Sequence, residues 1–157
     1  MLQDLGLHTN EISPYEFEIY EEEVRLLCFK YEPENELSFS EYHDYATEDQ
    51  IKAMYKYVAW FVTAKGYRIV RSITDLTHFD GSFAGIGEWF YTKYIPKAIE
   101  AGLRASANVK PKDFFAQLAL DELEEIAGDI YEHQVFETLE EAYQWITNLE
   151  FKKTEVL

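Results

Sequence analysis

The sequence predicts an α/β domain in which strands and helices alternate along most of the chain. Two observations support this fold class. Short apolar runs, such as the one over 67–74, are followed by segments in which apolar residues recur every three or four positions. Capping signals and glycines separate these segments. The expected order is β-β-α-β-α-β-α-β-α, a mostly parallel sheet with an antiparallel strand at one edge and helices packed on the sheet.

The N-terminal part of the chain is predicted to contain a hairpin. Residues 1–13 show no clear period and are expected to form an arm. From Tyr15 onward apolar and acidic residues alternate, as in a strand with one face in water. A continuous apolar run over 24–31 is typical of a strand covered on both faces. The two segments are close enough in sequence to pair as antiparallel strands.

A polar connection over 33–40 separates the hairpin from a long helix. The helix begins either near Ser40 or at Thr47, where a hydroxyl is followed three residues later by an amide side chain, as in a capping box. Apolar residues then recur on one face until Gly66, which ends the helix. These residues are Ile51, Met54, Tyr55, Val58, Phe61 and Val62.

The rest of the chain alternates between strands and helices. Strands are expected at 67–74, 104–109 and 130–136, and helices at 83–101, 113–128 and 138–149. Pro96 must kink the helix that contains it or restart that helix, because proline cannot donate the internal hydrogen bond. We therefore expect one domain over 14–149, followed by a C-terminal tail over 150–157.

Composition and charge restrict the possible functions. Of the 157 residues, 47% are hydrophobic and 17% aromatic, which is enough to bury a core without metals or disulfides. The formal net charge is −16, so nucleic acid and anionic membranes are not expected partners. No apolar stretch has the length of a membrane span and no basic leader is visible, so we expect a soluble cytoplasmic protein. Cys28, the only cysteine, is expected to be an inert core residue, and no metal site is predicted.

A polar, glycine-bearing turn follows the strand at 67–74 and opens a helix, where free backbone N–H groups favour an anion or a side-chain oxygen. This segment, Asp75-Leu76-Thr77-His78-Phe79-Asp80-Gly81-Ser82-Phe83-Ala84-Gly85, resembles the strand-to-helix loop of the STAS domain. That fold is shared by anti-sigma factor antagonists and the cytoplasmic tails of sulfate transporters. The resemblance implies that Ser82 is a phosphoacceptor and that Asp80 and Gly85 support its loop. Gly81, a further supporting residue of this loop, stands where many antagonists have a second hydroxyl residue. From the residues alone, Ser82 is either such a switch or a plain N-cap.

The chain is more similar still to a bacterial STAS-like group of unassigned function. The similar features are Trp89-Phe90, Pro96, Ala101-Gly102-Leu103, Pro111, Asp113, Phe115-Ala116-Gln117-Leu118, and Leu139-Glu140-Glu141-Ala142 with Trp145. This similarity extends over 15–149 by the order of the elements, and it implies a STAS-like fold without implying an activity.

Aromatic residues cover most of the circumference of the helix predicted at 83–101, which a helix with a single buried face does not require. They are Phe83, Trp89, Phe90, Tyr91 and Tyr94. Either a protein surface or an apolar ligand could cover the rings that the core does not. Alternatively, all of them fold inward around a kink at Pro96.

The sequence lacks a recognisable catalytic set. Ser82 has no obvious paired histidine, and the glycines form neither a nucleophile elbow nor a dinucleotide-binding fingerprint. We therefore expect a non-enzymatic protein without a cofactor. The leading hypothesis is a regulatory or protein-interaction module in bacterial signalling, acting as a homodimer or docked to another protein. The alternative is a binding or carrier protein for a small apolar, lipid-like ligand.

Overall fold

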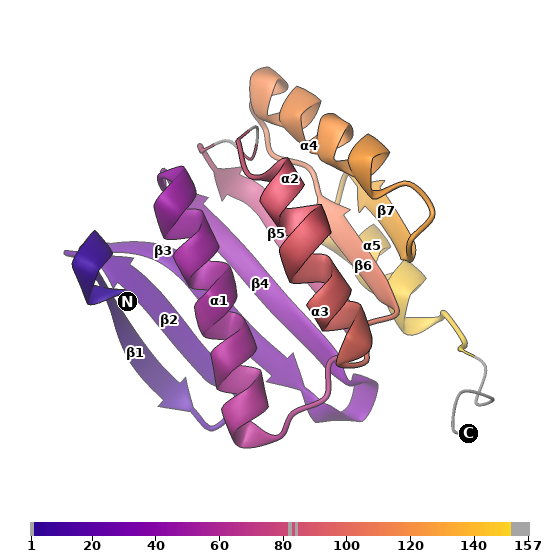
Figure 1. The fold of residues 1–157 in the computed structure, drawn as a ribbon, viewed down its shortest axis with the longest axis horizontal. Coiled ribbons are helices and arrows are strands. Elements are labelled where there is room, and N and C mark those ends of the chain that lie inside the picture. Colours follow the sequence, from indigo (N-terminus) through magenta and orange to yellow (C-terminus); the bar gives the residue numbers. More distant parts are fainter. Residues whose placement is uncertain (1, 82, 84, 152–157) are drawn as a thin grey trace.

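The computed structural model describes residues 2–81, 83 and 85–151. Within these residues seven strands form a single sheet and lie side by side in chain order (Figure 1). The strands are β1 (Leu7–Ser13), β2 (Glu16–Glu21), β3 (Val24–Glu32), β4 (Leu37–Asp44), β5 (Arg71–Phe79), β6 (Ala105–Val109) and β7 (Glu132–Phe136). Antiparallel pairs connect β1 through β4, and parallel pairs connect β4 through β7. The sheet is therefore mixed, and β4 joins its two halves.

The helices cover the two faces of the sheet unequally (Figure 1). One face carries α1 (Glu48–Lys65), α4 (Phe114–Ala127), and between them a continuous helical segment made of α2 (Gly87–Trp89), the π-helical η3 (Phe90–Tyr94) and α3 (Ile95–Glu100). The other face carries α5 (Leu139–Thr147), which packs against β5, β6 and β7. Two single turns, η1 (Gln3–Leu5) and η2 (Pro33–Asn35), complete the elements. Among the described residues, no helix lies behind β1, β2 and most of β3.

The structure differs from the sequence prediction in the N-terminal part of the chain. The arm expected over 1–13 is instead η1 followed by β1, which pairs with β2 as the edge strand. The polar connection expected over 33–40 contains the beginning of β4. Both strands are rich in polar residues. Strand β1 lies at the edge of the sheet and is therefore largely exposed. The serines of β4 face a cavity that is described below. The expected mostly parallel sheet consequently has as many antiparallel as parallel pairs.

The predicted helix ends are confirmed where local capping determines them. Thr47 Oγ1 accepts a hydrogen bond from the backbone N–H of Gln50 at 3.1 Å, and Gln50 Oε1 accepts one from the N–H of Thr47 at 3.0 Å. This capping box starts α1 at the later of the two predicted positions. Gly66, with φ of 72°, ends the helix in the left-handed conformation. Asp113 caps α4 by accepting from the N–H of Ala116 at 2.9 Å.

The helical backbone continues through Pro96 without a break, so the helix does not restart there. The hydrogen-bonding pattern changes instead: the π-helical turn η3 ends immediately before α3, and Pro96 is the second residue of α3. The helical segment begins at Gly87 rather than at 83, and Ile86 holds the N-cap position without a side-chain hydrogen bond. Strand β5 extends to Phe79, beyond the predicted strand end at 74, so the turn between β5 and α2 covers 80–86 and is shifted along the chain from the predicted 75–82.

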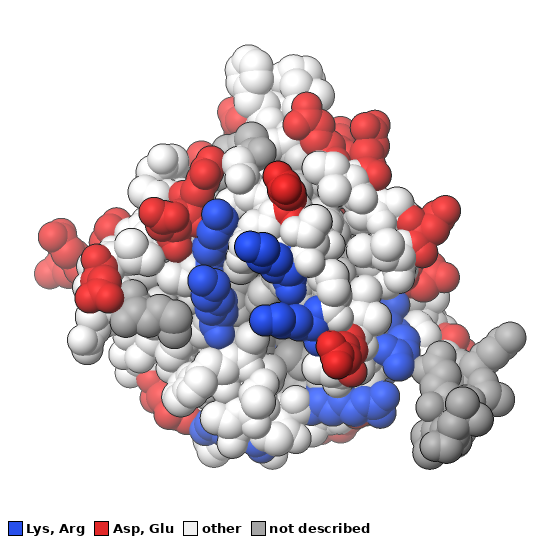
Figure 2. Space-filling view, in the orientation of Figure 1, with Lys and Arg blue, Asp and Glu red and all other residues white. Residues whose placement is uncertain are grey.

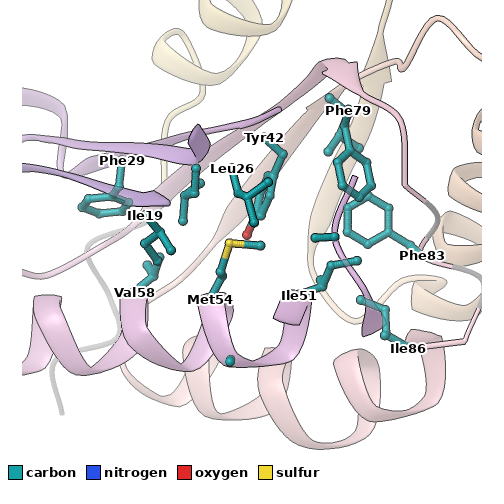
Figure 3. Close-up of a cluster of buried hydrophobic side chains, with 14 of the residues drawn as sticks. Ile19, Leu26, Phe29, Tyr42, Ile51, Met54, Val58, Phe79, Phe83 and Ile86 are labelled. Atoms are coloured by element: carbon teal, nitrogen blue, oxygen red, sulfur yellow. The ribbon is translucent and has the colours of Figure 1, made fainter. Parts of the chain in front are cut away.

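The main core lies between α1 and the antiparallel half of the sheet. Figure 3 shows Ile51, Met54 and Val58 of α1 pointing toward side chains of the sheet. Tyr42 of β4 is completely buried among them. Next to this core, the rings of Phe79 and Phe83 pack with centroids 5.1 Å apart. None of the described helices is long and apolar enough to cross a membrane.

Candidate functional site

The loop between β5 and α2 includes Ser82, which lies outside the described residues, so both interpretations of Ser82 stay predictions. The neighbouring residues are placed. The backbone N–H of Asp80 donates to the carbonyl of Asp44 at 2.8 Å. A Cβ at Gly81 would overlap the ring of Phe79, and one at Gly85 would overlap the carboxylate of Glu48. A side chain at Gly81 would therefore displace the buried ring of Phe79, whereas one at Gly85 would displace only the end of the Glu48 side chain.

A larger feature is a cavity of about 670 Å³ between the helix layer and the sheet. It extends beneath the α2–η3–α3 segment, from α1 on one side to Leu120 and Leu123 of α4 on the other. Strands β4, β5 and β6 form its floor. Cavities that bind small molecules commonly have volumes of about 300–1,000 Å³, so this one is large enough for such a ligand.

The floor of this cavity is made of small polar side chains arranged in two rows across the strands. One row is Ser38, Ser72 and Ser106, and the other is Ser40, Thr74 and Asn108. The members of each row are direct partners in the strand register. At these positions a helix-covered sheet usually carries large apolar side chains. The small residues leave the volume of the cavity unfilled and present hydroxyl and amide groups to it.

The walls are aromatic and aliphatic, and all five aromatic residues predicted from the sequence line them. Phe83 and Tyr91 are buried, and Trp89, Phe90 and Tyr94 are partly buried. The three partly buried rings pack around Tyr55 of α1, with the Phe90 and Tyr94 centroids each 5.0 Å from that of Tyr55. The hydroxyl of Tyr94 donates to the carbonyl of Tyr55 at 3.1 Å. These rings connect α1 to the α2–η3–α3 segment and form one side of the cavity.

Lysines gather between α1 and α3, at the opening of the cavity. Lys56, Lys93 and Lys97 line it, and the Nζ atoms of Lys52 and Lys56 lie 5.8 and 6.0 Å from the centroid of the Trp89 ring. Figure 2 shows basic side chains in the centre of this face and acidic side chains mostly toward its rim. The chain has only 14 lysines and arginines and a net charge of −16, and four of these basic residues belong to this cluster: Lys52, Lys56, Lys93 and Lys97. The cluster creates a locally positive potential that attracts anions.

The hydroxyls of Tyr91 and Tyr131 in the cavity stay protonated at neutral pH. Burial raises the pKa of Tyr131 to about 12, and burial also raises the pKa of Tyr91 well above its ordinary value. Both residues line the cavity and can therefore donate hydrogen bonds to a ligand oxygen. Among the described residues, no carboxylate, imidazole or thiol lines the cavity. The described lining can bind a ligand through hydroxyl, amide and ammonium groups.

Sequence reasoning found the aromatic wall and missed the floor and the lysines. The floor residues come from strands separated by long stretches of chain, so only the strand register brings them together. A local signal was nonetheless present, because the pairs Ser38–Ser40 and Ser72–Thr74 alternate with larger residues as strand residues do. The lysines lie at spacings of four residues, Lys52 with Lys56 and Lys93 with Lys97, which places each pair on one helix face.

The protein is a mixed α/β protein with a cavity under its helix layer. No family model matches its sequence, and the comparison with curated proteins found no match. Among solved structures, it is similar to the crystal structure of an uncharacterized protein from the DUF3478 family with a SpoIIAA-like fold from Shewanella loihica PV-4. The two sequences are 11% identical, the comparison covers 90% of this chain and 94% of that chain, and the TM-score is 0.44. The fold that this description names is the anti-sigma factor antagonist fold implied by the sequence resemblance, and nothing about function follows from a likeness at this level.

Proposed function

We propose that this protein binds a small amphipathic anion in the cavity between its helix layer and its sheet. The observation that carries the proposal is the combination of an aromatic wall, a floor of hydroxyl groups and a lysine cluster at one opening. The apolar body of such a ligand would contact Tyr55, Phe90 and Tyr94, and its anionic end would lie near Lys56 and Lys93. This develops the lipid-like-ligand alternative derived from the sequence by adding a charge to the ligand.

A pair of fluorescent probes tests both parts of the proposal. The two are 8-anilinonaphthalene-1-sulfonate, which is an anion, and N-phenyl-1-naphthylamine, which has the same aromatic body without the charge. Both are expected to bind the full chain at one site. Lys56→Gln and Lys93→Gln should each lower the affinity for the anionic probe at least several-fold and leave the affinity for the neutral probe unchanged. Lys112→Gln, an exposed lysine away from the cavity, is the matched control.

A further variant tests whether the probes bind inside the cavity. Ala98 lies on α3 and lines the cavity, so Ala98→Trp places a large ring in that space. The variant should lose binding of both probes and keep the helical circular dichroism of the natural chain. Equal probe binding by Ala98→Trp and the natural chain would show that the probes bind elsewhere and would refute the proposal. Independently of the probes, mass spectrometry of the purified protein under native conditions should identify any natural ligand that remains bound.

Protein interaction, the leading hypothesis from the sequence, is a second candidate because α4 exposes apolar side chains. Phe114 and Phe115 are 65% and 76% exposed, and their rings contact each other with centroids 5.8 Å apart. Glu122 and Glu125 are exposed on the same helix, so charge complementarity favours a partner protein with basic residues around an apolar surface. Light scattering of the natural chain and of a Phe114→Ser, Phe115→Ser variant measures self-association. If the natural chain is a dimer and the double variant is a monomer, the partner is instead a second copy of this chain.

A further inference from the structure

The face of the sheet opposite α1 carries a compact group of side chains that bind metal ions. Cys28 on β3 and Glu41 and His43 on β4 each offer one ligand atom, and these three atoms lie within 4.8 Å of one another. The group contains three different ligand types: a thiol, a carboxylate and an imidazole. None of these residues lines the cavity, because neighbouring residues of β4 point to opposite faces of the sheet. The group is therefore separate from the site described above.

The strand register explains how the group assembles. Cys28 lies directly opposite Glu41 in the pairing of β3 with β4, and directly opposite Glu18 in the pairing of β2 with β3. His43 follows Glu41 by two residues, so its side chain projects from the same face. Four candidate ligands thus come from three adjacent strands. Their separation in sequence explains why no metal-binding spacing was visible there.

Contacts within the group hold the side chains close together. Glu18 Oε2 lies 3.8 Å from the sulfur of Cys28, and Glu41 Oε1 lies 2.5 Å from His43 Nε2. The His43 ring stacks on that of His78, with centroids 5.5 Å apart and an interplanar angle of 7°, which limits its rotation. The side chains of Glu18, His43 and Glu41 are only 13%, 16% and 27% exposed, although no described helix covers them. Three ionisable groups are therefore partly removed from water on an open sheet face.

The charges around Cys28 are predominantly negative. Carboxylates stand opposite it on both neighbouring strands, and Glu41 is in turn paired in register with Asp75 of β5. Like charges placed directly opposite each other in a sheet are destabilising. Arg25 offsets part of this charge, since its Nη1 lies 3.1 Å from Glu18 Oε2. Glu41 pairs with His43, and Asp75 accepts two hydrogen bonds from Thr77, but neither carboxylate forms an ion pair with a lysine or arginine among the described residues. A bound cation would relieve this repulsion.

We propose that Cys28, Glu41 and His43, with Glu18 as a fourth ligand, form a binding site for a divalent ion of the zinc type. Zinc accepts thiolate, imidazole and carboxylate ligands together, whereas magnesium and calcium prefer oxygen ligands alone. In a tetrahedral zinc site the ligand atoms are about 3.5 Å apart, so small side-chain rotations would bring Cys28, Glu41 and His43 into place. Glu18 contacts only the sulfur of Cys28 and lies outside this group of three, so its carboxylate must move further. On binding, the thiol of Cys28 loses its proton to solvent and its sulfur coordinates the ion. The proton shared by His43 Nε2 and Glu41 also leaves to solvent, with His43 keeping a proton on Nδ1, so that Nε2 and the carboxylate each form a metal–ligand bond. No oxidation or reduction is involved.

The first test measures metal binding by the full chain after treatment with a chelator. Cobalt(II) is used as a spectroscopic substitute for zinc, because a cobalt–thiolate bond gives a charge-transfer band in the near ultraviolet. We expect one equivalent of cobalt to produce this band and one equivalent of zinc to abolish it. Cys28→Ser should remove the band completely, and His43→Gln should weaken zinc binding at least tenfold. His8→Gln, a histidine of β1 that contacts the carbonyl of Glu22, is the matched control and should bind as the natural chain does.

The second test needs no variant at a ligand position. Because Cys28 is the only cysteine, the rate of alkylation by iodoacetamide reports on its sulfur alone. Zinc should slow this reaction at least tenfold in the natural chain, and magnesium at the same concentration should not. Failure of zinc to protect Cys28, or a cobalt complex without a thiolate band, would overturn the proposal. If Glu18→Gln binds zinc with the affinity of the natural chain, Glu18 is not a ligand and the proposed site consists of three residues.

Discussion

Arg71, the first residue of β5, connects the C-terminal helix to the rest of the domain. Its guanidinium donates three hydrogen bonds, each 3.0 Å long, to the carbonyls of Asn35, Ile146 and Leu149. The last two carbonyls lie at the end of α5 and beyond it, where a helix has acceptors without internal partners and a negative dipole end. The guanidinium also lies 5.0 Å from the ring of Phe151. We predict that Arg71→Met releases this end of the chain.

The expected loss of stability follows from the three hydrogen bonds. Each contributes roughly 1 kcal/mol net, because Arg71 is partly exposed and water replaces part of what is lost. The free energy of unfolding should therefore fall by about 3 kcal/mol, which in a domain of this size lowers the melting temperature by about 6–12 °C. Arg71→Lys keeps the charge but cannot reproduce three diverging hydrogen bonds, so its free energy of unfolding should fall by about half as much as that of Arg71→Met.

Urea denaturation followed by tryptophan fluorescence measures this loss, since Trp145 of α5 packs on Phe136 with ring centroids 5.4 Å apart. Arg68→Met is the matched control. The Arg68 side chain is 59% exposed and makes one ion pair of 4.0 Å with Glu36, which is worth no more than about 1 kcal/mol. If Arg71→Met is no less stable than Arg68→Met, the reasoning from the three carbonyl contacts is wrong.

Three further predictions concern other contacts. Burial alone would lower the pKa of His133, but hydrogen bonds with the Gly128 carbonyl and the Glu124 carboxylate outweigh it and raise this pKa. The stability that protonated His133 adds is thus complete below its unfolded pKa and disappears as the pH rises through its folded pKa. Urea unfolding should accordingly show His133→Gln losing more stability at pH 5.5 than at pH 8.5, and an equal loss would contradict this. The hydroxyl of Tyr42 is buried and makes no hydrogen bond of standard geometry among the described residues, although it interacts with the hydroxyl of Tyr55, so Tyr42→Phe should raise the free energy of unfolding by about 1 kcal/mol. A lower urea midpoint for that variant would mean that the hydroxyl has a partner. A Cβ at Gly87 would lie 2.8 Å from Leu123 Cδ2, so in the same assay Gly87→Ala should be destabilising, because overpacking of about 1–3 kcal/mol outweighs a helix-propensity gain of about 1 kcal/mol.

The sequence was sufficient for those parts of the fold that local interactions determine. The end of α1 at Gly66 and the cap at Asp113 each depend on atoms within four residues, so their signals are complete in the sequence, whereas Thr47 was one of two predicted starts of α1. The strand β1 was missed because it is an edge strand with one buried residue, Leu7, and therefore has no apolar period. The strand β4 was missed because a cavity, rather than a core, lies above Ser38 and its neighbours.

The candidate sites were less predictable for the same reason. The aromatic wall lies within one helical segment, so its residues attracted attention before the fold was known. The floor of the cavity and the group around Cys28 are cross-strand arrangements. Glu18, Cys28 and Glu41 become neighbours only through two strand registers, and a shift of either by one residue would turn one of these side chains to the opposite face. Sequence periodicity identifies a strand, but it does not specify its partners.

The size of the cavity limits what it can contain in solution. A sealed and dry cavity of about 670 Å³ would cost about 16 kcal/mol at roughly 24 cal/mol per Å³. This is more than the whole stability of a typical domain, about 5–15 kcal/mol. Water can occupy the space because the rows headed by Ser38 and Ser40 offer hydrogen bonds. A ligand that displaces this water and is wholly apolar would leave those hydroxyls unsatisfied, at about 1–3 kcal/mol each. For the proposed function, this cost favours a ligand that carries hydrogen-bonding groups as well as an apolar body, and the lysines at the opening favour a negatively charged one.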